Sequence, residues 1–407
     1  TVAVYPGDKN NLPYDVVVQT LRTNEPEPPT PAVEPEKTLD EVLDEHPVSI
    51  QVNGEWQTFP NVKAAEEASY EEYKANLRRT AENFRITDDH LGEGGPKAKF
   101  QANVEAIKLL KYLEETTEQA TPEQQKILSR YVGWGGLADA FDPDKESWSK
   151  EYAQLKELLT PEEYAAARGS TLNAHYTSPT VIKAIYEAVG RMGFETGNIL
   201  EPSCGVGNFF GMLPEEMRNS RLYGVELDSI SGRIAQQLYP KADITVAGFE
   251  TTDRRDFYDL AVGNVPFGQY QVRDKAYDKL NFSIHNYFFA KALDQVRPGG
   301  VVAFVTSRYT MDAKDSTVRR YLAQRAELLG AIRLPNDAFK KNAGAEVVSD
   351  IIFLQKRDRP LDIVPEWTQT GQTEDGFAIN RYFLDHPEMV LGRQEPESTA
   401  HGMDYTV

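Results

Sequence analysis

The sequence predicts an α/β protein in which a doubly wound sheet of seven strands follows a mainly helical N-terminal region. From Asn198 onward, short apolar runs alternate with amphipathic stretches, which is the pattern of strands joined by helices. Several runs end in Glu or Asn, and such sheets bind ligands at the carboxyl ends of their strands. The seven expected strands contain residues 199–200, 222–225, 244–246, 260–262, 301–305, 329–332 and 351–354.

The composition sets outer limits on the kind of protein. The 407 residues suffice for two or three domains, and no run of eighteen apolar residues occurs, so neither a transmembrane helix nor a membrane partner is expected. The single cysteine, Cys204, excludes an internal disulfide framework and is typical of the reducing cytoplasm. Six scattered histidines offer no zinc-ligand spacing, so no metal site is predicted. Because the chain begins with Thr1, we expect it to be a fragment of a longer protein or a processed product.

Changes in composition divide the chain into five regions. The acidic, proline-rich stretch is typical of an extended linker, and helical periodicity follows it in residues 62–84 and 101–130. Thr121 and Pro122 mark a helix start, with Thr at the N-cap and Pro at the first helical position. The regions are a short strand or remnant (1–22), the linker (23–38), a mainly helical region (39–168), the main α/β domain (169–357) and a C-terminal extension towards further sequence (358–407).

Two glycine-rich stretches precede the main domain. Residues 92–97 (Gly-Glu-Gly-Gly-Pro-Lys) lack the Gly-Lys-Ser/Thr ending of a phosphate loop, and no apolar strand precedes them, which favours a turn before a helix. Residues 131–136 (Tyr-Val-Gly-Trp-Gly-Gly) form an aromatic-glycine turn. A packing corner is the structural interpretation of this turn, and base stacking or covering of a cofactor is the functional one.

The first chemical motif places a Gly-x-Gly turn between a strand and a helix, in residues 198–209 (Asn-Ile-Leu-Glu-Pro-Ser-Cys-Gly-Val-Gly-Asn-Phe). Gly205 and Gly207 lack a Cβ and would let the backbone approach a ligand. A dinucleotide fingerprint needs a further glycine where this chain has Phe210, so the loop suits a pyrophosphate poorly. Glu201, at the strand end, favours a positively charged ligand such as the ammonium group of an amino acid.

The second motif is a strand that ends in Glu226, in residues 222–228 (Leu-Tyr-Gly-Val-Glu-Leu-Asp). In doubly wound sheets a carboxylate at the end of the second strand holds ribose hydroxyls. We therefore expect Glu226 to bind the ligand, and Asp228 is placed to cap the next helix.

The third motif is a strand that runs into Asn264-Val-Pro-Phe267. The Asn264 side-chain oxygen and the Val265 carbonyl, which Pro266 fixes, can each accept a hydrogen bond from an amino group. The Phe267 ring can stack on a flipped base. Two acceptors polarise the amino nitrogen without a general base of high pKa. An ordinary turn after a strand is the structural alternative.

Jointly, these motifs resemble the amino-methyltransferases of DNA, chiefly the adenine-N6 type. Residues 201–209 resemble motif I of that family, residues 224–228 its motif II, residues 264–267 its catalytic Asn/Asp-Pro-Pro-Tyr/Phe motif, and residues 174–179 (Ala-His-Tyr-Thr-Ser-Pro) its motif X. The resemblance implies a Rossmann-like fold, S-adenosylmethionine as cofactor, and methyl transfer to an exocyclic amino group of DNA. Residues 91–96, 131–136 and 263–268 further resemble very large methyltransferase–helicase proteins of phages and conjugative elements, which implies a helicase domain in the same full-length chain.

The resemblance also implies site residues. Val265 stands where the family usually has Pro, and it can serve because the chemistry uses its backbone carbonyl. Residues 247–250 (Ala-Gly-Phe-Glu) lack the Asp that often contacts the cofactor adenine, so Glu250 or a backbone N–H is the candidate there. The implied catalytic residues are Asn264, Val265, Pro266 and Phe267. The implied cofactor-binding residues are Tyr176, Thr177, Glu201, Ser203, Gly205, Gly207, Asn208, Glu226, Leu227, Phe249 and Asn264.

Charge is distributed unevenly along the chain. The net charge of −19 argues against a general nucleic-acid coat, because phosphate contacts need Lys and Arg. Residues 251–357 nevertheless hold 17 basic and 12 acidic residues, and this stretch contains the proposed catalytic loop. Chance variation along a surface is the alternative interpretation. The DNA-binding candidates are Arg254, Arg255, Arg273, Lys275, Lys279 and Arg308, with Lys314, Arg319 and Arg320 in addition.

Two other functions stay open from the sequence. A non-catalytic module that binds cofactor or DNA beside a helicase would be consistent with Val265 and with the acidic charge. A methyltransferase acting on RNA or on a protein amide is the second alternative, since an amide also presents a planar amino group.

Overall fold

The computed structural model describes residues 3–6, 14–17, 45–171, 177–339, 347–399 and 402–407. The expected linker of residues 23–38 lies outside the described residues, as do Tyr176 and the preceding part of the motif X resemblance. Internal contacts divide the chain into two units, residues 1–80 and 81–407. The expected helical region of residues 39–168 is therefore shared between two units.

In the residues that the structure describes, the first unit contains two hairpins and one helix. The hairpin of β3 and β4 differs from the helical expectation for this part of the chain. Val48, Ile50 and Val52 alternate towards a small core, and the strands turn at Asn53-Gly54, where both residues have positive φ. Asn-Gly favours such turns. The elements are β1 (Ala3–Pro6), β2 (Tyr14–Val17), β3 (Val48–Val52), β4 (Glu55–Phe59) and α2 (Val62–Thr80).

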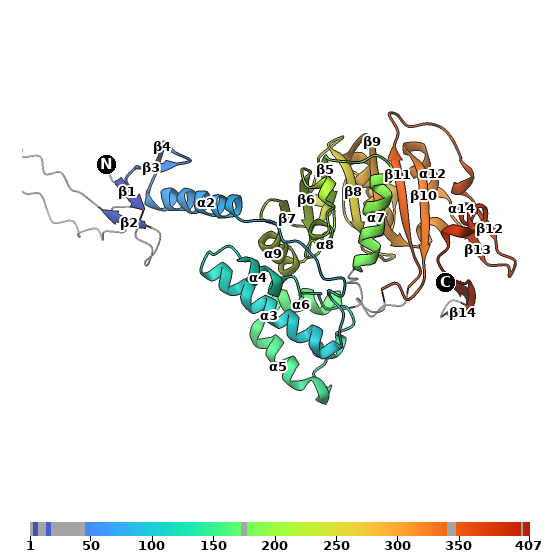
Figure 1. Cartoon of the computed structure of the whole chain (residues 1–407), viewed down its shortest axis with the longest axis horizontal. Coiled ribbons are helices and arrows are strands. Elements are labelled where there is room, and N and C mark those ends of the chain that lie inside the picture. The colour runs from blue at the N-terminus through green and yellow to red at the C-terminus, as the bar shows by residue number, and fades with distance from the viewer. Residues whose placement is uncertain (1–2, 7–13, 18–44, 172–176, 340–346, 400–401) are drawn as a thin grey trace, which may run out of the picture. The chain divides into compact units, whose positions relative to one another are not determined.

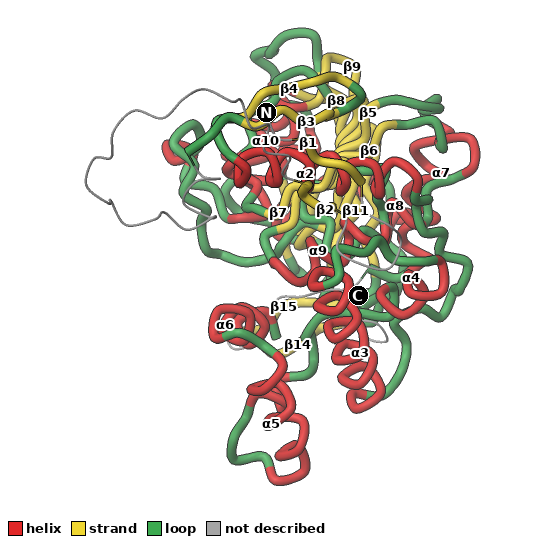
Figure 2. The backbone as a smooth tube through the Cα atoms, turned by 90° about the vertical axis from the view of Figure 1, so that its left-hand side faces the viewer, coloured by secondary structure: helices red, strands yellow, loops and turns green. Residues whose placement is uncertain are grey.

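The second unit begins with a group of helices (Figure 2). Thr121 accepts a hydrogen bond from the Gln124 backbone and the Gln124 side chain bonds back to Thr121, which confirms the predicted helix start. Residues 92–95 form the predicted turn before a helix, and Pro96 occupies its first position. The helices are α3 (Pro96–Glu115), α4 (Pro122–Leu128), α5 (Ser149–Leu158) and α6 (Pro161–Ser170).

All seven predicted strands form one sheet, in the order β10-β11-β9-β8-β5-β6-β7 (Figure 1). Strand β11 lies antiparallel to both β9 and β10, and the pairs from β9 to β7 are parallel. The carboxyl ends of β5, β6 and β8 consequently meet at one edge. The strands are β5 (Asn198–Glu201), β6 (Arg221–Glu226), β7 (Asp243–Val246), β8 (Tyr258–Asn264), β9 (Val296–Ser307), β10 (Ala326–Leu334) and β11 (Ser349–Lys356).

Helices cover both faces of the sheet, as the doubly wound prediction requires. Ile199 packs into a core with α7 and α9, whereas its neighbour Leu200 packs into a second core with α10. Ser178 caps α7 and Pro179 is its first residue, as predicted. The helices are α7 (Pro179–Arg191), α8 (Asn208–Gly211), α9 (Ser229–Leu238), α10 (Ile284–Gln295), α11 (Tyr309–Asp312) and α12 (Thr317–Arg325).

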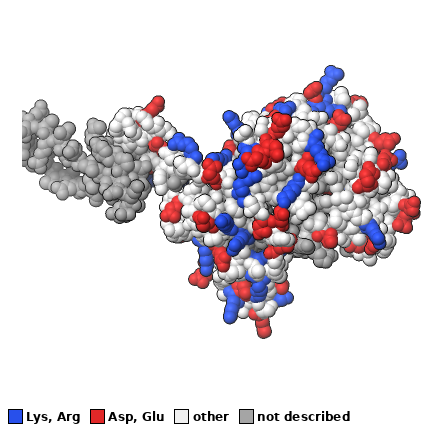
Figure 3. All heavy atoms as spheres, in the orientation of Figure 1, with Lys and Arg blue, Asp and Glu red and all other residues white. Residues whose placement is uncertain are grey.

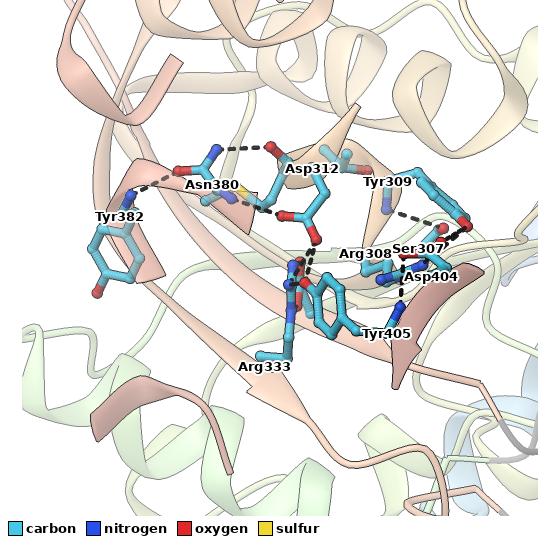
Figure 4. Close-up of polar contacts among 12 residues, drawn as sticks. Ser307, Arg308, Tyr309, Asp312, Arg333, Asn380, Tyr382, Asp404 and Tyr405 are labelled. Carbon is cyan, nitrogen blue, oxygen red and sulfur yellow. Dashed lines mark hydrogen bonds and ion pairs between the residues drawn. The ribbon is translucent and has the colours of Figure 1, made fainter. Parts of the chain in front are cut away.

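The described C-terminal residues pack onto this unit. Buried Arg333 on β10 donates to Asp350 at 2.8 Å and to Asp312 at 2.7 Å, and Tyr405 donates to Asp312 at 2.6 Å (Figure 4). Phe383 and Tyr405 are buried in the core that also contains α10. These elements are β12 (Thr370–Gln372), β13 (Ala378–Asn380), α14 (Arg381–Asp385), β14 (Glu395–Thr399) and β15 (Gly402–Thr406). None of the helices in the described ranges has the length and apolar character that crossing a bilayer requires.

Candidate active site

The carboxyl ends of β5, β6 and β8 line a cavity of about 490 Å³, a size typical of small-molecule sites. The structure thereby brings three sequence motifs together around one space. Most of the predicted site residues in the described ranges line the cavity: Thr177, Glu201, Ser203, Gly205, Asn208, Glu226, Leu227, Phe249, Asn264, Val265 and Pro266. Glu250, the candidate adenine contact, lines it as well.

Glu226 is held at the end of β6 by backbone donors. The Gly205 N–H donates to Oε2 and the Asp228 N–H to Oε1, each at 2.7 Å. Burial raises the pKa of Glu226 to about 7, although these backbone hydrogen bonds oppose the shift. Each carboxylate oxygen can accept more than one hydrogen bond, so Glu226 can still accept from sugar hydroxyls. Asp228 caps α9 by accepting from Ser231, as predicted.

Glu201 lies buried at the end of β5. Its Oε2 atom has no hydrogen-bond partner among the described residues. Burial, reinforced by the Glu226 carboxylate, raises the pKa of Glu201 well above its usual range. A buried carboxyl group that lacks a partner is costly, and a cationic ligand in the cavity would compensate this cost.

The two glycines of the first motif have different physical roles. Gly205 has φ +55° and lines the cavity, and a Cβ added there would meet no atom within 4 Å. The backbone of Gly205 is therefore open to a ligand, and its role in binding one stays a prediction. Gly207 does not line the cavity, and an added Cβ would lie 2.6 Å from the Tyr239 ring. Gly207 is thus needed for internal packing, which corrects its predicted role in approaching the ligand.

Asn264 is the last residue of β8 and is oriented by a neighbouring segment. Its side-chain Nδ2 donates to Thr177 Oγ1 at 3.0 Å, which joins the catalytic motif to the start of α7. The Val265 N–H donates to the Val305 carbonyl at 3.1 Å and so continues the sheet ladder. The polar groups of Asn264 and Val265 therefore project from a rigid strand end, which limits their movement.

The aromatic residue of the catalytic motif lies differently from the prediction. Phe267 is half-buried against the core that contains α7, and it is not among the residues that line the cavity. Tyr270 does line the cavity and is 50% exposed. Tyr270 lies only three positions after Phe267, and this second aromatic residue in the sequence was the signal for an alternative stacking surface.

The predicted DNA-binding residues separate into three groups. Arg254 stacks on Phe257 and lies near Asp243, while Arg255 pairs with Asp294 at 2.8 Å. These positions are at the amino-terminal ends of the strands. Strand β8 has seven residues, so Asn264 lies about 20 Å away at its other end. This geometry corrects the assignment of Arg254 and Arg255 to DNA bound at the cavity.

Burial removes two further candidates. Arg308 is 7% exposed and pairs with Asp404 (Figure 4), and Arg319 is 1% exposed and donates to backbone carbonyls. On the face that Figure 3 shows, basic and acidic side chains of the described residues are interspersed. The exposed candidates are Arg273, Lys275, Lys279, Lys314 and Arg320.

Comparison with known proteins identifies relatives of the chain. It is 29% identical over 272 residues to Defense against restriction protein B of Escherichia phage P1, a match that covers 65% of this chain and 10% of the relative. It is 37% identical over 92 residues to the Type II methyltransferase M.CvrRI of Paramecium bursaria Chlorella virus XZ-6E, covering 23% of this chain and 24% of the relative. The chain thus matches at most about a quarter of either relative's length.

Solved structures are similar at low sequence identity. A chain of the type I R-M system is 16% identical, with a TM-score of 0.38, over 74% of this chain and 76% of that chain. TrmN from Thermus thermophilus is 19% identical, with a TM-score of 0.32, over 44% of this chain and 49% of that chain.

The family profile described as N-6 DNA Methylase matches residues 157–369, which is more than half of the chain. This range includes Glu201, Glu226 and residues 264–267. S-Adenosylmethionine is the cofactor of such enzymes, and the cavity fits it. Glu201, whose buried Oε2 atom has no partner among the described residues, would hold its ammonium group, and Glu226 would hold its ribose. The chain belongs to the N-6 DNA methylase family.

Proposed function

We propose that the chain transfers a methyl group from S-adenosylmethionine to an exocyclic amino group of DNA, at adenine N6. The observation that carries this proposal is the joint lining of one cavity by Glu201, Glu226 and Asn264. Glu201 is placed to bind the ammonium group of the cofactor, and Glu226 is placed to bind its ribose. Asn264 is placed to accept a hydrogen bond from the planar amino group of the base.

Orientation and hydrogen bonding account for the catalysis by the chain's own residues. The Asn264 amide oxygen accepts one hydrogen bond from the target amino group, and the Thr177 contact fixes its direction. The Val265 carbonyl accepts a second one. These two acceptors increase the electron density on the nitrogen and hold it in line for attack. S-Adenosylmethionine, when bound, would supply the activated methyl group and leave as S-adenosylhomocysteine, and the proton lost from the methylated nitrogen would pass to solvent.

The aromatic surface for the target base is proposed at Tyr270. It lines the cavity together with Pro266, and its carbonyl accepts from the Ile284 N–H at 2.8 Å, which ties the loop to the start of α10. Stacking on a base is worth about 1–3 kcal/mol. Because Phe267 packs against the core and does not line the cavity, its substitution should act mainly on folding.

Contacts with DNA phosphates are proposed for the loop after the catalytic motif. Arg273, Lys275 and Lys279 are exposed in this loop. Asp274, between the first two, accepts from Tyr287 at 2.8 Å and from Lys291 at 2.7 Å. The loop is therefore anchored to α10, so its cations project from a fixed position next to the site.

The expected helicase domain in the same full-length protein stays a prediction from the resemblance. A DNA substrate is consistent with the N-6 DNA methylase family.

The proposal is tested by separating cofactor binding from methyl transfer. Asn264→Ala should abolish transfer of labelled methyl to DNA and leave cofactor affinity nearly unchanged, because the Asn264 amide oxygen addresses the base while Glu201 and Glu226 keep their proposed contacts with the cofactor. Calorimetry gives the affinity, and scintillation counting of the DNA gives the transfer. Undiminished transfer by Asn264→Ala would show that this strand end is not the active site.

A further inference from the structure

The turn of residues 131–134 (Tyr-Val-Gly-Trp) lines the same cavity as the methyltransferase motifs. Ala166, Gly169 and Ser170 near the end of α6 line it too. This wall comes from the helical part of the second unit, upstream of every cofactor motif in the sequence. The cavity is therefore built from both the helical part and the sheet.

Specific contacts hold the turn in place. Asn103 on α3 is fully buried, and its side chain accepts from the Val132 N–H at 2.9 Å and donates to the Gly133 carbonyl at 2.6 Å. Gly133 has φ +72°, a conformation that disfavours a side chain. The Trp134 ring packs edge to face with the Phe141 ring, and the two ring centroids lie 5.3 Å apart. Packing of this kind gives the turn a fixed shape before any ligand binds.

The helical part is also joined firmly to the sheet through α9. The Gln125 side chain donates to the Gln237 and Leu238 carbonyls, each at 3.2 Å. Arg233 pairs with Glu163 of α6 at 2.6 Å and with Glu114 of α3 at 2.8 Å. Helix α9 follows directly after Glu226 and Asp228, so the turn and the ribose-binding carboxylate share one support.

Tyr131 lines the cavity together with Glu226, at the end of β6, and with Asp228 just beyond it. Burial, with the nearby Asp228 and Glu226 carboxylates, raises the pKa of the Tyr131 phenol, whereas hydrogen bonding to Ser231 opposes this shift. Its hydroxyl group therefore remains neutral and can donate as well as accept. Glu226, Asp228 and Ser231, which line the cavity with Tyr131, lie at its predicted ribose end, and this favours a cofactor wall over a base-stacking surface.

We infer that the turn of residues 131–134 is a cofactor-binding element that covers the adenosine end of S-adenosylmethionine, with Tyr131 beside the ribose. The inference rests on the proposed function, because it needs that cofactor in the cavity. The N-terminal helices would thus take a direct part in cofactor binding, in addition to the methyltransferase motifs.

The test compares two tyrosine-to-phenylalanine variants of the whole chain. Tyr131→Phe removes the hydroxyl at the cavity. Tyr164→Phe removes one from the same helical core, where Tyr164 packs on Phe141 at 5.3 Å and does not line the cavity. Calorimetry with S-adenosylhomocysteine should show about threefold to tenfold weaker binding for Tyr131→Phe and less than twofold change for Tyr164→Phe. Thermal unfolding without ligand verifies that both variants fold.

A second measurement does not depend on any substitution. Hydrogen–deuterium exchange of the wild-type chain should slow in residues 131–136 when S-adenosylhomocysteine is added, and stay unchanged in residues 149–158 of α5. The inference is overturned, and the proposed function stands, if the wild type binds the ligand but Tyr131→Phe binds it equally well and the ligand does not slow exchange in residues 131–136. If Tyr131→Phe lowers only DNA methylation, the turn serves the base and the inference is overturned. If the wild type binds no ligand, the proposed function fails together with the inference.

Discussion

Replacement of Glu226 by Gln is the most informative single change at the cofactor site. The carboxylate accepts from the Gly205 and Asp228 N–H groups, both at 2.7 Å. Gln offers only one oxygen, so one backbone donor would face an NH₂ group, at a cost to stability of about 1–3 kcal/mol. Ribose hydroxyls would also lose a charged acceptor worth about 1.5–3 kcal/mol, which corresponds to about 10-fold to 150-fold in affinity.

Calorimetric titration of Glu226→Gln with S-adenosylmethionine checks this magnitude. Asp259→Asn is the matched control, because Asp259 also accepts a backbone N–H, from Asn198 at 2.7 Å, but lies near the amino-terminal end of β8. The control should bind the cofactor within twofold of wild type. If Glu226→Gln also bound within twofold, the assignment of Glu226 to the ribose would be refuted.

Three further predictions concern pH, stability and DNA. Burial raises the pKa of Glu226 from 4.5 to about 7, so its contribution to stability is present below pH 4.5 and lost as pH rises through 7. In denaturant titrations, the free energy of unfolding of the wild type should therefore fall relative to that of Glu226→Gln as pH rises from 4.5 to 7. Arg333→Met should lower the free energy of unfolding by about 3–5 kcal/mol, because it leaves Asp312 and Asp350 buried without their cation; an unchanged denaturation midpoint would contradict this. Reversing Lys279 to Glu should weaken DNA binding and reduce its salt dependence, whereas Arg255→Glu should leave both nearly unchanged in fluorescence anisotropy; the opposite ranking would restore the original assignment.

The sheet was predictable because burial on both faces leaves a strong signal in the sequence. Ile199 and Leu200 enter opposite cores, and an apolar run of this kind is required wherever helices cover both sides. The β3–β4 hairpin is hard to predict because each strand has only five residues and a long helical pattern follows, although Asn53-Gly54 is a turn signal.

The polar strand ends were predictable for a different reason. Glu201, Glu226 and Asn264 each end a strand, and parallel strands bring such ends to one edge. Sequence position alone did not indicate which edge Arg254 occupies, nor that Gly207 lies against Tyr239. It also did not reveal that the turn of residues 131–134 reaches the cavity, because only tertiary packing joins the helices to the sheet.

The central claim is tested most directly by identifying the methylated nucleoside. The chain is incubated with S-adenosylmethionine that carries a deuterated methyl group and with unmethylated DNA, and the digested DNA is analysed by mass spectrometry. RNA and protein substrates are run in parallel. We expect labelled N6-methyladenine in DNA with the wild-type chain and none with Asn264→Ala. Label in RNA or protein alone, or none despite calorimetric binding of the cofactor, would contradict it.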